Sequence, residues 1–178
     1  MIQQYNRPAV ALHWLIALLI LAALPLGLYM HDLPLSPTKL KLFSYHKWIG
    51  VTVLWLAVLR ILWRFAQKAP APLPAPRWQQ LAAAATHGFL YLLLFAIPIS
   101  GWLMSSAKGF TTVYFGVLPL PDLVAKDATL GETLTEVHEA LNYFLMGLLA
   151  LHIAGALKHH FIDHDATMRR MSFRRATS

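Results

Sequence analysis

The 178-residue sequence contains no cysteine. This absence excludes disulfide bonds, thiolate-held iron–sulfur clusters, cysteine-based zinc sites and covalently attached c-type haem. Charged residues are also scarce, at 13% of the chain, whereas soluble domains contain about 25%. Hydrophobic residues make up 57%, against roughly 45–50% in soluble domains. The composition therefore excludes an ordinary soluble domain.

The excess hydrophobic residues are concentrated in four stretches, 9–29, 45–65, 81–104 and 133–157. Each has about the 20 residues that an α-helix needs to cross a hydrocarbon layer of about 30 Å. The first stretch also resembles a secretory signal, but it is long enough to span the layer and three more stretches follow it. The sequence predicts an all-α integral membrane four-helix bundle that forms a single transmembrane domain over residues 1–178.

The chain carries 15 Lys+Arg against 8 Asp+Glu, a net charge of +7. In a soluble protein this balance would suggest a nucleic-acid partner, but in a membrane protein it indicates orientation and contact with anionic lipid. Four spans place both termini on one side, which would hold ten basic residues while the other side holds five. The positive-inside rule therefore predicts that both termini are cytoplasmic.

Five of the nine histidines fall within the predicted spans, where ionisable residues are costly and usually functional. The span directions place His13, His87 and His152 near the inner face, and His46 and His138 near the outer face. His138 and His152 are 14 residues apart, which separates them by about 21 Å along a helix and leaves them only about 40° out of register. Matching depths pairs His46 with His138 and His13 with His152, with His87 in reserve.

Two imidazoles from different helices at one depth are typical of a haem iron with two axial histidines. A zinc or copper site would need three or four ligands at that depth. The alternative is that these histidines are core residues bonded to neighbouring backbone or hydroxyl groups. If both axial positions are filled, the iron has no open site for oxygen, and the pattern then predicts electron transfer. A metal-ion transporter is disfavoured, because the spans lack paired midplane carboxylates and broken helices.

The sequence resembles the bacterial cytochrome b561 family over essentially the whole chain. The matching features, in chain order, are Leu12-His13-Trp14, His46 ahead of Gly50, Arg60 with Trp63-Arg64, His87, Tyr91, Pro98, Gly101, His138-Glu139, Asn142, Leu151-His152, His159-His160 and Asp165-x-Thr167-x-x-Arg170-Met171.

The resemblance implies two non-covalent b haems, bound by His13 with His152 and by His46 with His138. It also implies a multi-pass protein of the bacterial inner membrane that passes electrons between the quinone pool, with ubiquinone as acceptor or substrate, and a second redox partner. At least one family member oxidises superoxide at the outer face and reduces ubiquinone. An oxidoreductase of the superoxide oxidase type is therefore expected.

Two further polar residues are candidates for the inner haem. Arg60 lies 14 residues after His46, so it shares that helix face and reaches the inner depth. It is expected either to pair with a haem propionate or to extend to the cytoplasmic surface. His87 is expected to contact a propionate or a quinone, or else to be a core histidine.

The quinone and the outer substrate each have one candidate residue. His159 lies seven residues after His152, on nearly the same helix face and below the inner haem, where an imidazole can donate a hydrogen bond and a proton to a quinone. The alternative is that His159 and His160 touch lipid phosphate. Lys108 is the candidate for a small anionic redox substrate at the outer face, and three other lysines lie on that side: Lys39, Lys41 and Lys47.

Two functional classes fit this pattern. One is a stand-alone, quinone-linked oxidoreductase. The other is a haem-bearing membrane anchor subunit of a larger enzyme of the hydrogenase or formate dehydrogenase type. Short loops favour the first, because they leave little surface on which a partner subunit could dock.

Overall fold

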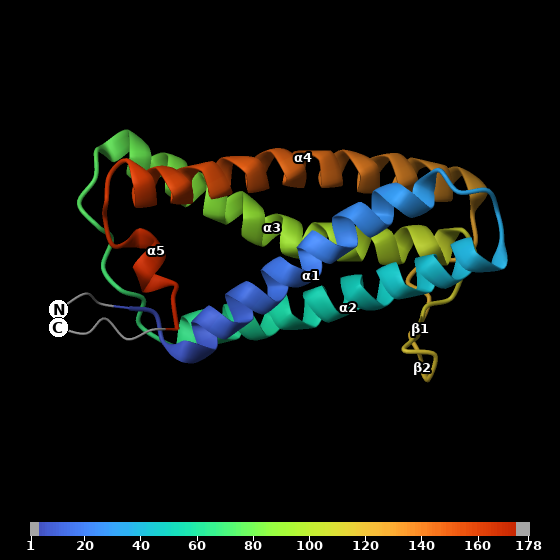
Figure 1. Cartoon of the computed structure of the whole chain (residues 1–178). Coiled ribbons are helices and arrows are strands. Elements are labelled where there is room, and N and C mark those ends of the chain that lie inside the picture. The colour runs from blue at the N-terminus through green and yellow to red at the C-terminus, as the bar shows by residue number, and fades with distance from the viewer. Residues whose placement is uncertain (1–3, 174–178) are drawn as a thin grey trace.

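The computed structural model describes residues 4–173 and consists mainly of four long helices (Figure 1). The elements in chain order are α1 (Arg7–His31), α2 (Pro37–Ala66), α3 (Arg77–Ala107), β1 (Val113–Tyr114), β2 (Leu118–Pro119), α4 (Ala128–Phe161) and α5 (Thr167–Arg170). Each long helix is long and apolar enough to cross a membrane. The prediction of an all-α, four-helix membrane protein is confirmed.

Each long helix extends beyond the hydrophobic stretch that predicted it. The difference is largest at α2, which begins at Pro37 rather than residue 45. Polar side chains cap these extensions, since Asn6, Ser36 and Asp127 accept hydrogen bonds from backbone amides at the starts of α1, α2 and α4. Such caps satisfy backbone donors that have no partner within the helix. Capping side chains therefore mark the starts of α1, α2 and α4, whereas α3 begins after Pro76 without a side-chain cap.

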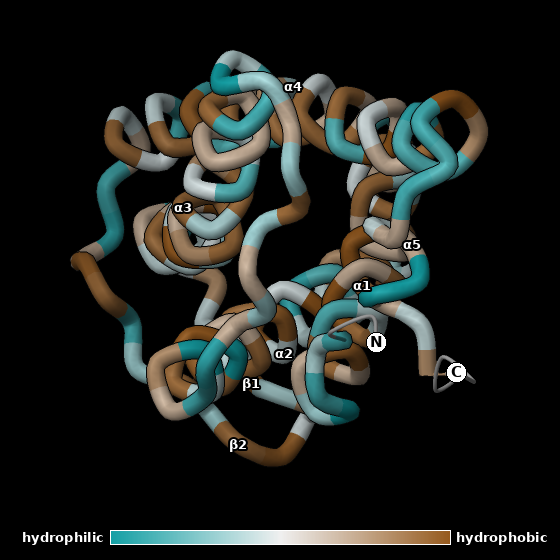
Figure 2. Tube along the Cα trace, turned by 90° about the vertical axis from the view of Figure 1, so that its left-hand side faces the viewer, coloured by the Kyte–Doolittle hydropathy of each residue, from teal (hydrophilic) through white to brown (hydrophobic). Residues whose placement is uncertain are grey.

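The four helices form two pairs, in which α1 packs on α2 and α3 packs on α4, and the α2–α3 contact joins the pairs. Figure 1 shows α1 crossing α2 obliquely, so that its end approaches the first part of α4. In the perpendicular view of Figure 2, hydrophobic segments occur in all four long helices. Large apolar side chains such as Trp55 and Leu92 are mostly exposed. This outward-facing apolar surface fits lipid as the surrounding solvent.

The two ends of the bundle have different coverings. The start of α1, the 67–76 connection and α5 lie at one end, here called the α5 end, and the β1–β2 hairpin lies at the other, the hairpin end (Figure 1). The start of α1 and α5 thus share a side, as an even number of spans requires. That the α5 end faces the cytoplasm stays a prediction from the distribution of basic residues.

The hairpin is fixed to the neighbouring part of α2. Trp48 Nε1 donates a hydrogen bond to the Val113 carbonyl (2.7 Å), and the hydroxyls of Thr52 and Tyr114 lie 2.8 Å apart. Gly116 has a φ of 73°, a left-handed conformation that glycine adopts without strain. Each strand is two residues long, which is too short for an alternation of polar and apolar residues to mark it in the sequence.

The tail, here residues 163–173, folds against α1 at the α5 end. Trp14 Nε1 donates to the Met171 carbonyl (2.9 Å), and the Tyr5 amide donates to the Arg170 carbonyl (3.2 Å). The Arg170 guanidinium donates to the carbonyl of Ala71 in the 67–76 connection (2.6 Å). The tail therefore covers the end of the helix that carries His13.

Candidate haem-binding sites

The four histidines predicted as ligands come together as two pairs. At the hairpin end, the ring centres of His46 on α2 and His138 on α4 are 6.3 Å apart. Towards the α5 end, the ring centres of His13 on α1 and His152 on α4 are 6.2 Å apart. Since α4 is one continuous helix, it carries one member of each pair on the same face.

These separations can be compared with the geometry of two imidazoles on one metal ion. If each ring nitrogen lies about 2.0–2.1 Å from the metal, as on zinc, and each ring centre about 1.1 Å farther, opposed ring centres are about 6.2–6.4 Å apart. Both observed distances fall within this range. The ring planes make angles of 73° and 84°, which two axial ligands can adopt because each ring is free to rotate about its bond to the metal. Both pairs therefore fit a bis-histidine haem.

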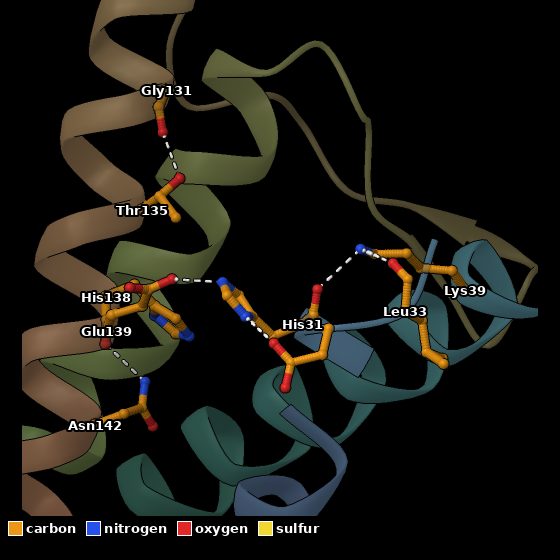
Figure 3. Close-up of polar contacts among 9 residues, drawn as sticks. His31, Leu33, Lys39, Gly131, Thr135, His138, Glu139 and Asn142 are labelled. Atoms are coloured by element: carbon orange, nitrogen blue, oxygen red, sulfur yellow. Dashed lines mark hydrogen bonds and ion pairs between the residues drawn. The ribbon is translucent and has the colours of Figure 1, made fainter. Parts of the chain in front are cut away.

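Hydrogen bonds orient His138 at the hairpin end. Ser100 Oγ donates to the Ile97 carbonyl and lies 2.9 Å from His138 Nδ1. Because the hydroxyl hydrogen is already used, Ser100 accepts a hydrogen bond from Nδ1–H. This arrangement fixes the tautomer and leaves Nε2 free to bind a metal. Asn142 in turn donates to the His138 carbonyl (2.7 Å), as Figure 3 shows.

Two glycines give the hairpin-end imidazoles their space. A Cβ atom at Gly101 would lie 3.0 Å from Cε1 of His138, and one at Gly27 would lie 3.1 Å from Cε1 of His46. Both distances are tighter than ordinary van der Waals contact. Nδ1 of His46 is buried and makes no hydrogen bond with any residue of the described chain. The close approach of the two imidazoles to the helix backbones therefore depends on glycine at positions 27 and 101.

Charge and hydrogen bonding distinguish the other pair. Arg60 of α2 is partly buried, and it donates to the Ala9 carbonyl (3.0 Å) and to the Tyr91 hydroxyl (3.1 Å). Its positive charge acts on both His13 and His152. The guanidinium is thus held between α1 and α3 beside the imidazoles, and it does not extend freely to the surface.

His87, which the sequence places at the same depth as this pair, lies next to His152. Its ring centre is 5.2 Å from that of His152, and its Nδ1 is 2.7 Å from the Ala83 carbonyl in the same helix. The 5.2 Å separation is shorter than two opposed ligands of one metal would show. His87 is therefore a neighbour of His152, and its side chain is exposed on α3.

The remaining predicted residues lie at opposite ends. His159 is near the end of α4, with its Nδ1 2.7 Å from Asp165 Oδ2. Lys108 follows α3 at the hairpin end. Its Cγ lies beside Gly131, which is in the first turn of α4. Two of the other predicted lysines, Lys39 and Lys47, are held by backbone carbonyls.

Sequence reasoning missed one polar contact close to His138. The imidazole of His31, at the end of α1, lies between Asp32 (2.9 Å) and Glu139 (3.4 Å). Figure 3 shows the contact of His31 with Glu139. Glu139 directly follows His138 on α4, so this contact joins α1 to α4 at the hairpin end. No pattern in the sequence indicates this contact, because it depends on the oblique path of α1.

Comparison with known proteins identifies the family. A family profile described as prokaryotic cytochrome b561 matches residues 4–174. The chain is 38% identical to cytochrome b561 homolog 2 of Escherichia coli K12 over 171 residues, which cover 95% of this chain and 91% of the relative. It is 30% identical to the probable superoxide oxidase CybB of Yersinia pestis over 184 residues, covering 95% and 96%. It is 29% identical to cytochrome b561 homolog 1 of Escherichia coli K12 over 180 residues, covering 97% and 98%.

The four membrane-length helices agree with these sequence relationships. The chain belongs to the prokaryotic cytochrome b561 family and is a multi-pass protein of the bacterial inner membrane that binds b-type haem and takes part in electron transport.

Proposed function

We propose that the protein carries electrons across the membrane through two bis-histidine b haems. His46 and His138 would hold one at the hairpin end, and His13 and His152 the other towards the α5 end. The observation that carries the proposal is the pair of ring-centre distances, 6.3 and 6.2 Å, on one helix that holds a histidine of each pair. Haem held by these imidazoles would supply a one-electron redox centre.

The surrounding residues would position the two cofactors differently. At the hairpin end, Ser100 holds the tautomer of His138, while Gly27 and Gly101 let the imidazoles approach the helix backbones. Towards the α5 end, Arg60 would bind a haem propionate, since its guanidinium is already anchored beside the ligand pair and a charge-assisted hydrogen bond to a carboxylate is strong. His87 would contact the same propionate or a quinone.

We further propose that a donor at the hairpin end reduces the protein and that membrane quinone accepts the electrons at the α5 end. Superoxide is the candidate donor, because a relative is named as a probable superoxide oxidase. Oxidation of two superoxide ions to two dioxygen molecules releases two electrons. A quinone takes up these two electrons with two protons and becomes a quinol. His159 would contact the quinone, and Lys108 would attract the anionic donor.

Ligand pairing is tested by single alanine variants. His46→Ala and His138→Ala should each remove the same haem, and His13→Ala and His152→Ala should each remove the other. His87→Ala should retain both haems. Haem content per protein and low-temperature reduced-minus-oxidised spectra measure the outcome. Depletion of spectroscopically different haems by His46→Ala and His138→Ala would disprove the pairing. Loss of a haem in His87→Ala but not in His13→Ala would show that His87, and not His13, is the ligand.

The glycine contacts give a second test of the hairpin-end site. Gly101→Ala should weaken haem binding there, because its Cβ would meet His138 at 3.0 Å and Ser100 restrains the imidazole from moving. Gly88→Ala on the same helix is the matched control, since a Cβ there has nothing within 4 Å. Haem titration of the purified proteins should show weaker loading only in Gly101→Ala. Equal loading in the two variants would contradict the proposed site.

The role of Lys108 is tested with superoxide and salt. Charge reversal in Lys108→Glu should slow haem reduction by superoxide roughly two- to five-fold at low ionic strength, and less at high ionic strength, where charges are screened. Lys68→Glu, in the connection at the opposite end, is the matched control. Stopped-flow spectroscopy after superoxide generation measures the rate. A rate that depends neither on salt nor on Lys108 would rule out this attraction.

The quinone site is tested by reoxidation of pre-reduced haem with ubiquinone. His159→Ala should keep both haems and slow reoxidation at least about ten-fold, since positioned acid–base groups typically contribute factors of about 100 or more. His160 points about 100° away around the helix, so His160→Ala should stay near the wild-type rate. If His159→Ala reoxidises at the wild-type rate, the quinone binds elsewhere.

A further inference from the structure

The end of α4 carries an imidazole–carboxylate contact that the proposed electron path does not yet use. We infer that Asp165 is a positioning residue that keeps hydrogen on Nδ1 of His159 and directs Nε2 towards the quinone, so that His159 passes a proton to the reduced quinone oxygen. The inference rests on the proposed function, because it requires that quinone meets His159. The evidence is the geometry of the segment between α4 and α5.

Asp165 is attached to His159 and α5 by three hydrogen bonds. Its Oδ2 lies 2.7 Å from His159 Nδ1, and its backbone amide donates to the His159 carbonyl (3.1 Å). Its other oxygen, Oδ1, accepts from the amide of Thr167, the first residue of α5 (2.7 Å). Backbone and side chain of one residue thus hold both the carbonyl and the imidazole of His159. The orientation of this ring is fixed by the chain turn itself.

The neighbouring Asp163 is engaged differently. Its Oδ2 lies 3.0 Å from His159 Nδ1, but both of its oxygens bind the Lys158 ammonium group (2.7 and 3.0 Å). The three side chains His159, Asp163 and Asp165 also resemble a cation site. Because Lys158 already neutralises Asp163, the cluster needs no added cation. Asp165 is therefore the carboxylate that is available to bind the imidazole of His159.

The charge of Asp165 determines the direction of its hydrogen bond to His159. Burial alone would raise the pKa of Asp165, but the hydrogen bonds from Thr167 and His159 and the nearby imidazole outweigh it and lower the pKa. The carboxylate is therefore ionised at neutral pH and only accepts hydrogen bonds. The hydrogen consequently stays on Nδ1, and Nε2 is the atom that gains and loses a proton.

The proton balance follows from this assignment. A quinone that receives two electrons needs two protons to become a quinol. Nε2–H of protonated His159 supplies one, water at this face supplies the second, and water then reprotonates Nε2. The other charged and titratable groups at this end of α4, in α5 and in the turn between them are Lys158, His160, Asp163, His164, Arg169 and Arg170.

The test compares two substitutions that remove the same charge from the same loop. Asp165→Asn keeps an oxygen for the Thr167 amide but can turn its NH₂ group towards Nδ1, which would move the imidazole hydrogen to Nε2. We expect quinone-dependent reoxidation of pre-reduced haem to fall about 10- to 100-fold, within the range for a general acid. Asp163→Asn, the matched control, should stay within two-fold of wild type. Haem content and reoxidation by ferricyanide, which needs no proton, should be unchanged in both.

The pH profile separates positioning from a structural effect. The wild-type rate should rise as the pH falls, since protonated Nε2 is the donor. In Asp165→Asn this step should disappear or shift by more than about half a pH unit. Asp165→Glu keeps a carboxylate and should recover at least about a third of the wild-type rate with the wild-type profile.

Each outcome bears on a different statement. Normal reoxidation in Asp165→Asn with slow reoxidation in His159→Ala would overturn the positioning role and leave the proposed quinone site intact. Normal reoxidation in His159→Ala would overturn both. Equal slowing by Asp165→Asn and Asp163→Asn would show that net charge alone matters, which also overturns the inference. If Asp165→Asn loses haem, the test passes to Asp165→Glu. If Asp165→Glu then recovers neither the reoxidation rate nor the pH profile of the wild type, the positioning role of Asp165 is overturned.

Discussion

The structure depends on the register of two histidines along one membrane-spanning helix. Hydrocarbon supplies no hydrogen-bond partners, so the chain must cross it as continuous helices. A continuous helix in turn fixes where its side chains point. Because they are 14 positions apart, His138 and His152 face the same side of α4 at depths about 21 Å apart. The partner histidines, His13 on α1 and His46 on α2, need only lie at these two depths, and the antiparallel order of the spans places them there.

The two histidine pairs have different surroundings because different constraints act at the two ends. At the hairpin end the imidazoles are enclosed by close packing against Gly27 and Gly101 and by a hydrogen bond with Ser100. Towards the α5 end a positive charge, Arg60, is held beside the pair by bonds to neighbouring helices. The first environment depends on shape and the second on charge. Two sites built from the same residue type can therefore differ chemically.

The tail of the chain links α4 to α1 at the α5 end. Asp165 turns the chain after α4, and the segment beyond it returns to Trp14, which is adjacent to His13. The indole of Trp14 therefore depends on the tail for its hydrogen-bond partner. One segment thus touches both the residue proposed to meet quinone and α1, which carries the proposed haem ligand His13. At the hairpin end, His31 and Glu139 make the corresponding contact between α1 and α4.

The sequence by itself determined the helix class, the four spans and the histidine pairs. Hydropathy and helical periodicity are local properties, and a span of fixed length converts position into depth. Only the tertiary structure decided which groups approach from other helices: the glycine contacts, the anchoring of Arg60, the closeness of His87 to His152 and the role of Asp165. These contacts, among which that of Asp165 with His159 is the geometric basis of the inferred role, depend on crossing angles and on irregular turns. No periodicity encodes them, because they arise between segments distant in sequence or in turns without a repeating backbone.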